Sequence, residues 1–135
     1  SLAPTPPAPG EPAHNGGARR VLVVDDNVDA ADLLCDILRG LGHEVRVARD
    51  GLAALAEVAS FHPEVLLLDI GLPGLDGYEV AARVRHADRS QPLLVAVTGY
   101  GQASDRRRSL EAGFDHHLVK PVDPARLQAI LAQAH

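Results

Sequence analysis

The chain has 135 residues, a common length for one domain and enough to bury a substantial core. Its net charge of -5 argues against a nucleic-acid-binding face, which needs clustered lysine and arginine, so we expect no nucleic acid partner. A single cysteine, Cys35, excludes an internal disulfide and a cysteine-based structural zinc site. Because the sequence has neither an apolar run of the roughly 18 to 20 residues of a membrane span nor a signal peptide pattern, we expect a cytoplasmic location without membrane contact.

Residues 1–18 are rich in proline, alanine and glycine, and Leu2 is their only bulky aliphatic residue. Such a segment buries too little apolar surface to offset the entropy lost on ordering. We expect a disordered linker at 1–18, followed by one folded domain at 19–135. The segment is either a tether to a preceding domain or a terminus without a structural role.

From Arg19 onward, apolar runs typical of strands alternate with helical patterns. The expected strands comprise residues 21–24, 44–48, 65–69, 93–97 and 117–119. Five strands that alternate with five helices predict an α/β fold, a flavodoxin-like three-layer (βα)5 sandwich with a parallel sheet. The second strand alternates between apolar and polar residues as an edge strand does, which favours the strand order 2-1-3-4-5.

Each expected helix carries an apolar stripe and a recognisable start or stop signal. Asn27 or Asp29 caps the first helix, and Asp123 with Pro124 starts the last one. The fourth helix, at about 103–112, has the weakest stripe. For the other four, in chain order, the residues expected to face the core are Leu33, Leu34, Ile37, Leu38 and Leu41; Leu52, Leu55, Ala56 and Ala59; Val80, Ala81 and Val84; and Leu127, Ile130 and Leu131.

Carboxylates follow two strands that are neighbours in this order. Asp25 and Asp26 end the first strand, and Asp69 ends the third. Adjacent strands lie about 4.8 Å apart, so the three acids converge and repel one another unless a cation joins them. A hard divalent cation, Mg2+ for preference, suits these oxygen ligands, and Lys120 at the end of the fifth strand supplies a second positive charge.

A carboxylate held beside Mg2+ and a lysine is equipped to attack a phosphoryl group and form an aspartyl-phosphate. Thr98, at the end of the fourth strand, offers a hydroxyl to one phosphate oxygen. The alternative is that acids at strand ends only form turns and caps. The joint pattern of Asp25, Asp26, Asp69, Thr98 and Lys120 on successive strand ends favours a reactive site.

The same pattern resembles the receiver domain of two-component response regulators over residues 19–134. The matching segments are VLVVDDN, LLLDIGLPGLDGYEV, VAVTG and HLVKP. The resemblance implies that Asp69 is the phosphoacceptor. It also implies that Asp26 binds Mg2+ directly, Asp25 mainly through water and Gly71 through its carbonyl. Thr98 and Lys120 would contact the phosphoryl group, and the Lys120-Pro121 peptide bond would be cis.

One position departs from the family pattern. Receivers usually carry tyrosine or phenylalanine three residues before the lysine, whereas this chain has His117, next to His116. As a switch residue, His117 would change rotamer on activation, and its side chain titrates near physiological pH. The alternative is that both histidines are merely exposed residues of an edge strand.

The function expected from these residues is that of a phosphoacceptor in two-component signalling. A histidine kinase or a histidine phosphotransfer domain would donate the phosphoryl group from phosphohistidine in a Mg2+-dependent transfer. The domain would not be an enzyme in the usual sense, because it catalyses only its own phosphorylation and dephosphorylation. Two placements stay open, a free-standing receiver and the carboxyl-terminal receiver of a hybrid histidine kinase, and the tether favours the second.

Two other classes of protein share parts of this pattern. A Mg2+-dependent phosphohydrolase of haloacid-dehalogenase type also forms an aspartyl-phosphate, but its nucleophile belongs on the first strand in a DxD spacing, whereas Asp25 and Asp26 are adjacent here. A nucleotide-binding module would need a glycine-rich loop after the first strand, and that loop is missing from the sequence.

Overall fold

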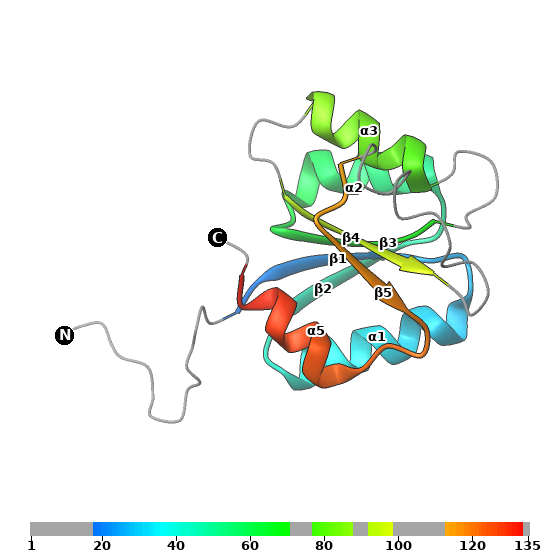
Figure 1. Ribbon diagram of the computed structural model, residues 1–135. Coiled ribbons are helices and arrows are strands. Elements are labelled where there is room, and N and C mark those ends of the chain that lie inside the picture. Colours follow the sequence, from blue (N-terminus) through cyan, green and yellow to red (C-terminus); the bar gives the residue numbers. More distant parts are fainter. Residues whose placement is uncertain (1–17, 71–76, 88–91, 99–112, 134–135) are drawn as a thin grey trace.

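A computed structural model describes residues 18–70, 77–87, 92–98 and 113–133 of the chain. They form a five-stranded parallel sheet in the order β2-β1-β3-β4-β5, so the predicted fold class and strand order are confirmed (Figure 1). The strands are β1 (Arg20–Val24), β2 (Glu44–Ala48), β3 (Val65–Asp69), β4 (Leu93–Thr98) and β5 (His116–Val119).

Four helices connect or follow these strands: α1 (Val28–Gly40), α2 (Gly51–Phe61), α3 (Gly77–Ala87) and α5 (Pro124–Leu131). The helix expected at about 103–112 and the linker expected at 1–18, apart from Ala18, lie outside the described residues. None of the helices that the structure describes is long and apolar enough to cross a membrane.

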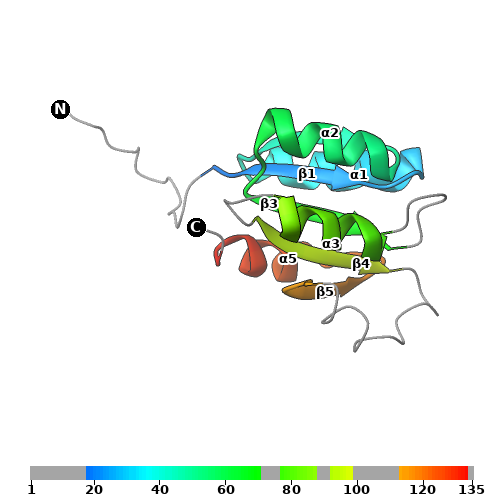
Figure 2. The same ribbon diagram turned by 90° about the horizontal axis from the view of Figure 1, so that it is seen from above.

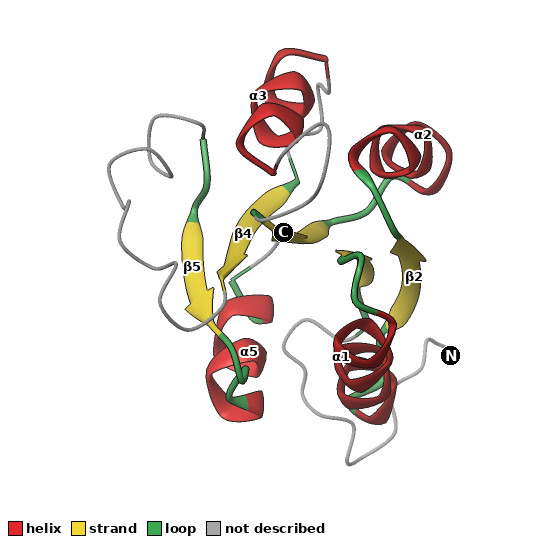
Figure 3. Cartoon of the chain, turned by 90° about the vertical axis from the view of Figure 1, so that its right-hand side faces the viewer, coloured by secondary structure: helices red, strands yellow, loops and turns green. Residues whose placement is uncertain are grey.

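The helices cover the sheet in two layers. Helices α1 and α5 lie on one face, and α2 and α3 lie on the other (Figures 1 and 3). Viewed from above, the strands fan out with the twist usual for such a sheet (Figure 2). Because side chains alternate along a strand, each central strand supplies both cores. The face toward α1 and α5 holds Val21, Val23, Val65, Leu67, Val95 and Val97, and the opposite face holds Leu22, Val24, Leu66, Leu68, Leu94 and Ala96.

The helix starts follow from the sequence. Asn27, one of the two predicted caps, accepts a hydrogen bond from the Ala30 N–H through its side chain at 3.0 Å. Asp123 caps α5, and Pro124 occupies its first turn as predicted. After α1, Gly42 adopts a φ of 95°, a conformation that favours glycine and turns the chain toward β2.

Two of the predicted helix faces are partly wrong. In α1 and at its end, Leu33 is 59% exposed and Leu41 is 41% exposed, although both were expected to face the core. Of the residues expected to face the core in α2, Leu52, Ala56 and Ala59 are exposed and Leu55 is only partly buried. The buried residues of α1 are Ala31, Leu34, Cys35 and Leu38, and those of α2 are Gly51, Ala54, Val58 and Phe61. The line of close contact with the sheet therefore takes in small residues, such as Ala31 and Ala54, along with larger ones, such as Leu38 and Phe61. The predicted faces of α3 and α5 are confirmed.

Arg85 near the end of α3 ties three segments together at the edge of the sheet where the strands begin. Its guanidinium donates hydrogen bonds to the Gly113 carbonyl at 2.7 and 3.0 Å and to the Pro92 carbonyl at 3.1 Å. It also pairs with Asp115 at 2.6 Å, and the same Asp115 oxygen accepts the Leu94 N–H at 2.9 Å. The clamp therefore holds the starts of β4 and β5 against α3.

Replacing Arg85 with alanine should lower the free energy of unfolding by about 2–3 kcal/mol, because it leaves two carbonyls and one carboxylate without these donors. The matched control is Arg83→Ala in the same helix. Arg83 forms only an exposed pair with Glu79 at 3.5 Å, so its loss should cost less than about 0.5 kcal/mol. Urea unfolding of both variants checks this, and equal losses would contradict the role of the clamp.

Candidate functional site

The sheet register brings the predicted carboxylates together. Val24, the last residue of β1, pairs with Leu68, so Asp25 comes next to Asp69 at the carboxyl edge of the sheet. On the other side of β1, the Asp25 N–H donates to the Ala48 carbonyl at 3.1 Å, which fixes the Asp25 backbone beside the end of β2. Both acids continue the alternation of Val23 and Leu67, which face α1 and α5.

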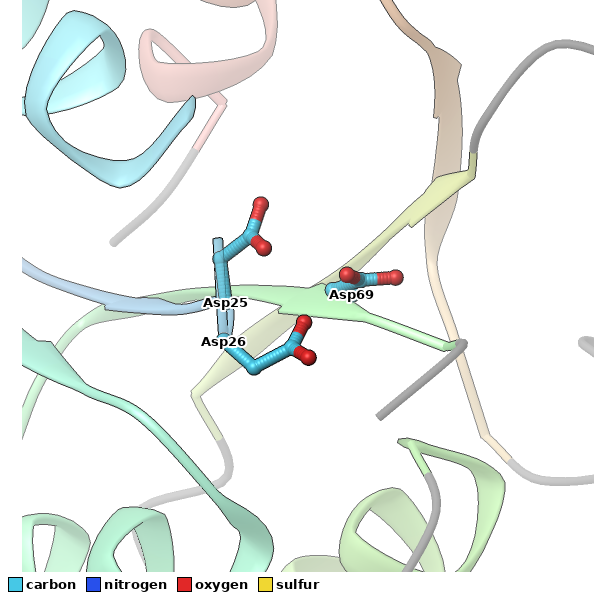
Figure 4. Close-up of side chains that lie close together, drawn as sticks. All are labelled: Asp25, Asp26 and Asp69. Carbon is cyan, nitrogen blue, oxygen red and sulfur yellow. The ribbon is translucent and has the colours of Figure 1, made fainter. Parts of the chain in front are cut away.

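The carboxylate cluster consists of Asp25, Asp26 and Asp69. Ligand oxygens of all three lie within 4.8 Å of one another (Figure 4). Asp25 is 2% exposed and Asp69 is 8% exposed, whereas Asp26 is open to solvent. Two of the three acids are thus removed from water. Inside the protein their mutual repulsion is poorly screened. Such a cluster is stable only if cations or strong donors balance its charge.

Lys120 supplies one balancing charge. It follows β5, and its N–H donates to the Thr98 carbonyl at 2.8 Å, which fixes the backbone next to β4. Its Nζ lies 2.8 Å from Asp25 Oδ2 and 3.7 Å from Asp69 Oδ2. The ammonium therefore bridges the two buried carboxylates. The Lys120-Pro121 peptide bond is cis, as the resemblance implied.

The electrostatics of Lys120 follow from this contact. Burial is the largest influence on its pKa and on its own would lower it, because the charged form loses water. The hydrogen bond to Asp25 and the charges of Asp69 and Asp25 together outweigh burial, so the pKa of Lys120 is raised. The raised pKa keeps Lys120 charged at neutral pH, and its stabilising contribution is lost only as the pH rises through that raised value.

Asp25 is held from both sides. Its Oδ2 binds Lys120, and its Oδ1 accepts the backbone N–H of Asn27 at 2.9 Å. The sequence predicted Asn27 only as a helix cap. Its second role could not be predicted, because the donor is a backbone N–H, which nearly every residue has. Fixing Asp25 in this way keeps the start of α1 attached to the cluster.

Thr98 and His117 lie on the neighbouring strands. Thr98 ends β4 and is fully buried, and its Oγ1 donates to the Leu118 carbonyl at 3.5 Å. His117 pairs with Ala96 across β4 and β5 and is partly buried, and its carbonyl accepts from Arg126 Nη2 at 3.3 Å. Thr98 therefore lies at the predicted edge of the sheet, while its described hydrogen bond goes to β5.

The loop after β3 is closed by Gly77, the first residue of α3. A Cβ at this position would lie 2.6 Å from the Ile70 Cα and 2.9 Å from the Asp69 carbonyl oxygen. Only glycine fits that approach without a backbone shift. The packing of Gly77 against the Asp69 backbone emerges only from the fold. Gly71, the predicted carbonyl ligand, lies outside the described residues.

The cluster fits a hard divalent cation. Carboxylate oxygens from adjacent strands are the ligands that Mg2+ and Ca2+ use in proteins. The cluster contains neither cysteine nor histidine, so soft metals are poorly matched. The solvent-open carboxylate of Asp26 leaves room for the water ligands that Mg2+ usually retains.

Comparison with known protein families shows which family has this site. Residues 21–132 match the response regulator receiver domain. The chain belongs to the response regulator receiver family. Receiver domains are regulatory modules of two-component signal transduction rather than ordinary enzymes, and they bind Mg2+ at an acidic pocket. The carboxylate cluster is such a pocket and could hold a metal ion.

Individual proteins give the same picture. A 14.6 kDa protein encoded in the sodA1 3' region of Leptolyngbya boryana is 38% identical over 84% of this chain and 87% of its own length. The DNA-binding response regulator MtrA of Mycobacterium tuberculosis is 40% identical over 82% of this chain and 48% of its own length. The CheY-like receiver domain protein of Methanospirillum hungatei has 31% identity and a TM-score of 0.77, with 85% of this chain and 91% of that one covered.

The prediction that nucleic acid is excluded as a partner is wrong. The chain spans about half the length of MtrA, whose name describes it as DNA-binding. The net charge of -5 describes this receiver domain alone and carries no information about the part of MtrA that lies beyond the match. Charge therefore does not exclude an output on nucleic acid for a protein that carries this domain.

The bridge from Lys120 to Asp25 gives a stability prediction for metal-free receiver domain. Lys120→Met should lower the free energy of unfolding by about 1–3 kcal/mol, because it leaves Asp25 buried beside Asp69 without a cation. This range is below the full cost of breaking a buried pair because Lys120 is 28% exposed.

A double-mutant cycle in buffer with a chelator isolates the pair. Asp25→Asn removes the charge that Lys120 balances, so Asp25→Asn/Lys120→Met should lose less stability than the two single losses added together. Strictly additive losses in urea unfolding would contradict the coupling of Lys120 to the cluster.

Proposed function

We propose that this receiver domain accepts a phosphoryl group on Asp69, in a Mg2+-dependent transfer from phosphohistidine. The observation that carries the proposal is the carboxylate cluster within 4.8 Å, bridged by Lys120, in a chain that matches the receiver family over residues 21–132. Asp69 is the acid of the cluster that ends the fully buried strand β3, so its backbone is held in place while its carboxylate lies at the carboxyl edge of the sheet beside Asp25 and Asp26.

The transfer is a substitution at phosphorus. An Asp69 carboxylate oxygen forms the new O–P bond as the P–N bond to the donor imidazole breaks. The electron pair of the broken bond stays on the imidazole nitrogen, which takes up a proton. The product is an aspartyl-phosphate, which carries about -1.5 to -2 charges in place of the single charge of the carboxylate, at a site that already holds two other acids.

The remaining residues have distinct proposed roles. Asp26 would ligate the metal directly, Asp25 mainly through water, and Asp69 and the Gly71 carbonyl would complete the protein ligands. When bound, Mg2+ would offset the charge that builds on the phosphoryl oxygens. Lys120 would move from the carboxylates toward the phosphoryl group, since its bond to Asp25 is between side chains and breaks without a backbone change.

Thr98 would donate its hydroxyl to a phosphoryl oxygen. Its present bond to the Leu118 carbonyl is long, at 3.5 Å, so little is lost when the hydroxyl turns away. Movement of Thr98 at the end of β4 would alter the packing beside β5. The phosphorylated state would thereby differ from the free state on the surface around β5 and α5.

The partner that fits this chemistry is a histidine kinase or a histidine phosphotransfer domain. The receiver would contribute catalysis only to its own phosphorylation and dephosphorylation, in the cytoplasm where such donors act. We take residues 19–135 as the receiver and 1–18 as a linker. Placement in a hybrid histidine kinase stays a prediction, since MtrA is a response regulator, and an output on DNA through a further region is equally a proposal.

Replacing Asp69 with asparagine should abolish phosphorylation by acetyl phosphate or a cognate kinase, because the amide lacks the nucleophilic oxygen. Intact-protein mass spectrometry with and without Mg2+ checks this, and borohydride labelling locates the acyl phosphate. Asp32→Asn, an exposed substitution in α1, is the matched control and should label like the wild type.

Several outcomes would contradict the assignment. Full labelling of Asp69→Asn, or undiminished labelling in excess chelator, would place the acceptor or its chemistry elsewhere. Steady turnover of a generic phosphatase substrate would instead favour a phosphohydrolase, and we expect none, since β1 ends in adjacent aspartates and the proposed acceptor lies on β3.

The role of His117 gives a separate prediction. As a switch residue it should occupy different side-chain rotamers in the free protein and in the protein bound to Mg2+ and beryllofluoride, a mimic of the phosphoryl group. Crystal structures of both forms, or the chemical shifts of the His117 ring, provide the measurement. Superimposable His117 side chains would leave it as an ordinary residue of β5.

A further inference from the structure

His43 lies at the edge of the sheet opposite the carboxylate cluster, in the turn between α1 and β2. It is 8% exposed, and its N–H donates to the Leu38 carbonyl at 3.1 Å, which anchors the turn. None of the roles assigned above uses this residue. A buried, titratable side chain usually has a specific partner, and His43 has one on each ring nitrogen.

The first partner determines the tautomer of the ring. His43 Nδ1 lies 3.0 Å from the backbone nitrogen of Arg19, which is a donor. Nδ1 must therefore be the acceptor, so the proton of the neutral ring is on Nε2. The Arg19 carbonyl also accepts the Glu44 N–H at 2.9 Å. Both backbone groups of Arg19 are thus bound to the turn that carries His43.

The second partner is on helix α5. His43 Nε2 lies 3.5 Å from Gln128 Oε1, which accepts the ring N–H. Beside Gln128, Leu127 and Leu131 are fully buried in the core that α1 and α5 share with the sheet. The imidazole therefore connects the residue before β1 with α5, two segments that are far apart in sequence.

We propose that His43 is an acid-sensitive latch that joins the start of β1 to helix α5 and opens when its imidazole takes up a proton. The protonated ring carries hydrogens on both nitrogens, so Nδ1–H would meet the Arg19 N–H donor to donor. The latch uses none of the residues of the phosphoryl site, because its contacts lie at the other end of the sheet.

The surrounding charges favour the neutral ring. Burial is the main reason that the pKa of His43 is lowered, and the nearby Arg19 guanidinium acts in the same direction. The hydrogen bond to Gln128 and the charge of Glu64 oppose this in part. Glu64 is itself engaged, since it pairs with Arg19 at 3.7 Å and accepts the Arg20 N–H at 2.9 Å.

The stability that His43 contributes depends on pH. With the pKa lower in the folded than in the unfolded protein, His43 contributes stability above its unfolded value of about 6.5, and this contribution is lost as the pH falls through the folded value. Mild acid should therefore loosen the link that His43 makes between Arg19 and α5.

The test is a titration of the labelled receiver domain from about pH 8 to about pH 5, followed by nuclear magnetic resonance. At high pH the His43 ring nitrogens should report the Nε2–H tautomer. The Arg19 amide and the Gln128 side chain should shift with the same midpoint as the His43 ring. Relative to its intrinsic rate, exchange of the Arg19 amide should accelerate about three- to tenfold below that midpoint, the effect of one lost hydrogen bond.

His43→Asn is the informative variant, because its amide oxygen replaces Nδ1 as an acceptor but does not titrate. The Arg19 midpoint should vanish in this variant. The matched control is His86→Asn, an exposed histidine of α3, which should leave the midpoint unchanged.

An Arg19 midpoint that persists in His43→Asn would overturn the proposal. If that variant does not fold, the titration of the His43 ring in the wild-type protein tests the proposal without it. An Nδ1–H tautomer at high pH, or a His43 titration that leaves the Arg19 amide unmoved, would equally rule out the latch.

Discussion

The contact between Lys120 and the carboxylates of Asp25 and Asp69 is the interaction on which the site depends. Two acids that are nearly removed from water cannot remain charged side by side unless a cation lies between them. Lys120 meets this requirement with a single flexible side chain, at 2.8 Å from one acid and 3.7 Å from the other. A metal ion and a phosphoryl group are the two ligands that would change this charge balance, and both enter the proposed reaction.

The fold makes this contact unavoidable. The order β2-β1-β3-β4-β5 places the ends of β1 and β3 side by side and leaves β5 two strands away from β3. Only a long side chain spans that separation, and lysine has the reach. Buried aliphatic residues on both faces of β1 and β3 fix the strand ends, and a fully buried leucine of this kind contributes about 1.5–3 kcal/mol. The core thus supplies the rigidity that the charged edge needs, while the Arg85 clamp secures the opposite edge of the sheet.

Much of this could be predicted from the sequence, because strand alternation and caps are local signals. The alternation of strand and helix patterns predicted the parallel sheet, and the edge-like pattern of residues 44–48 predicted its order. The acids that follow the first and third strands predicted the carboxylate cluster. The helix faces were harder, since Leu33 and Leu52 are large and apolar yet lie outside the line of close contact. Contacts made by backbone groups, such as Asn27 N–H to Asp25, and the close approach at Gly77 leave no residue pattern and emerge only from the packed structure. The net charge led to the wrong exclusion of a nucleic acid partner, because the charge of one domain does not describe the output of a longer relative.

The central claim is that Asp69, Lys120 and the metal-binding acids act as one unit centred on Asp69. The most direct measurement is a titration of the receiver domain with Mg2+ and beryllofluoride, followed by the backbone resonances of Asp69, Thr98 and Lys120. All three residues should show a second set of resonances that needs both additives and is missing in Asp69→Asn. The same spectral change in Asp69→Asn, or one that beryllofluoride produces without any divalent cation, would contradict the claim.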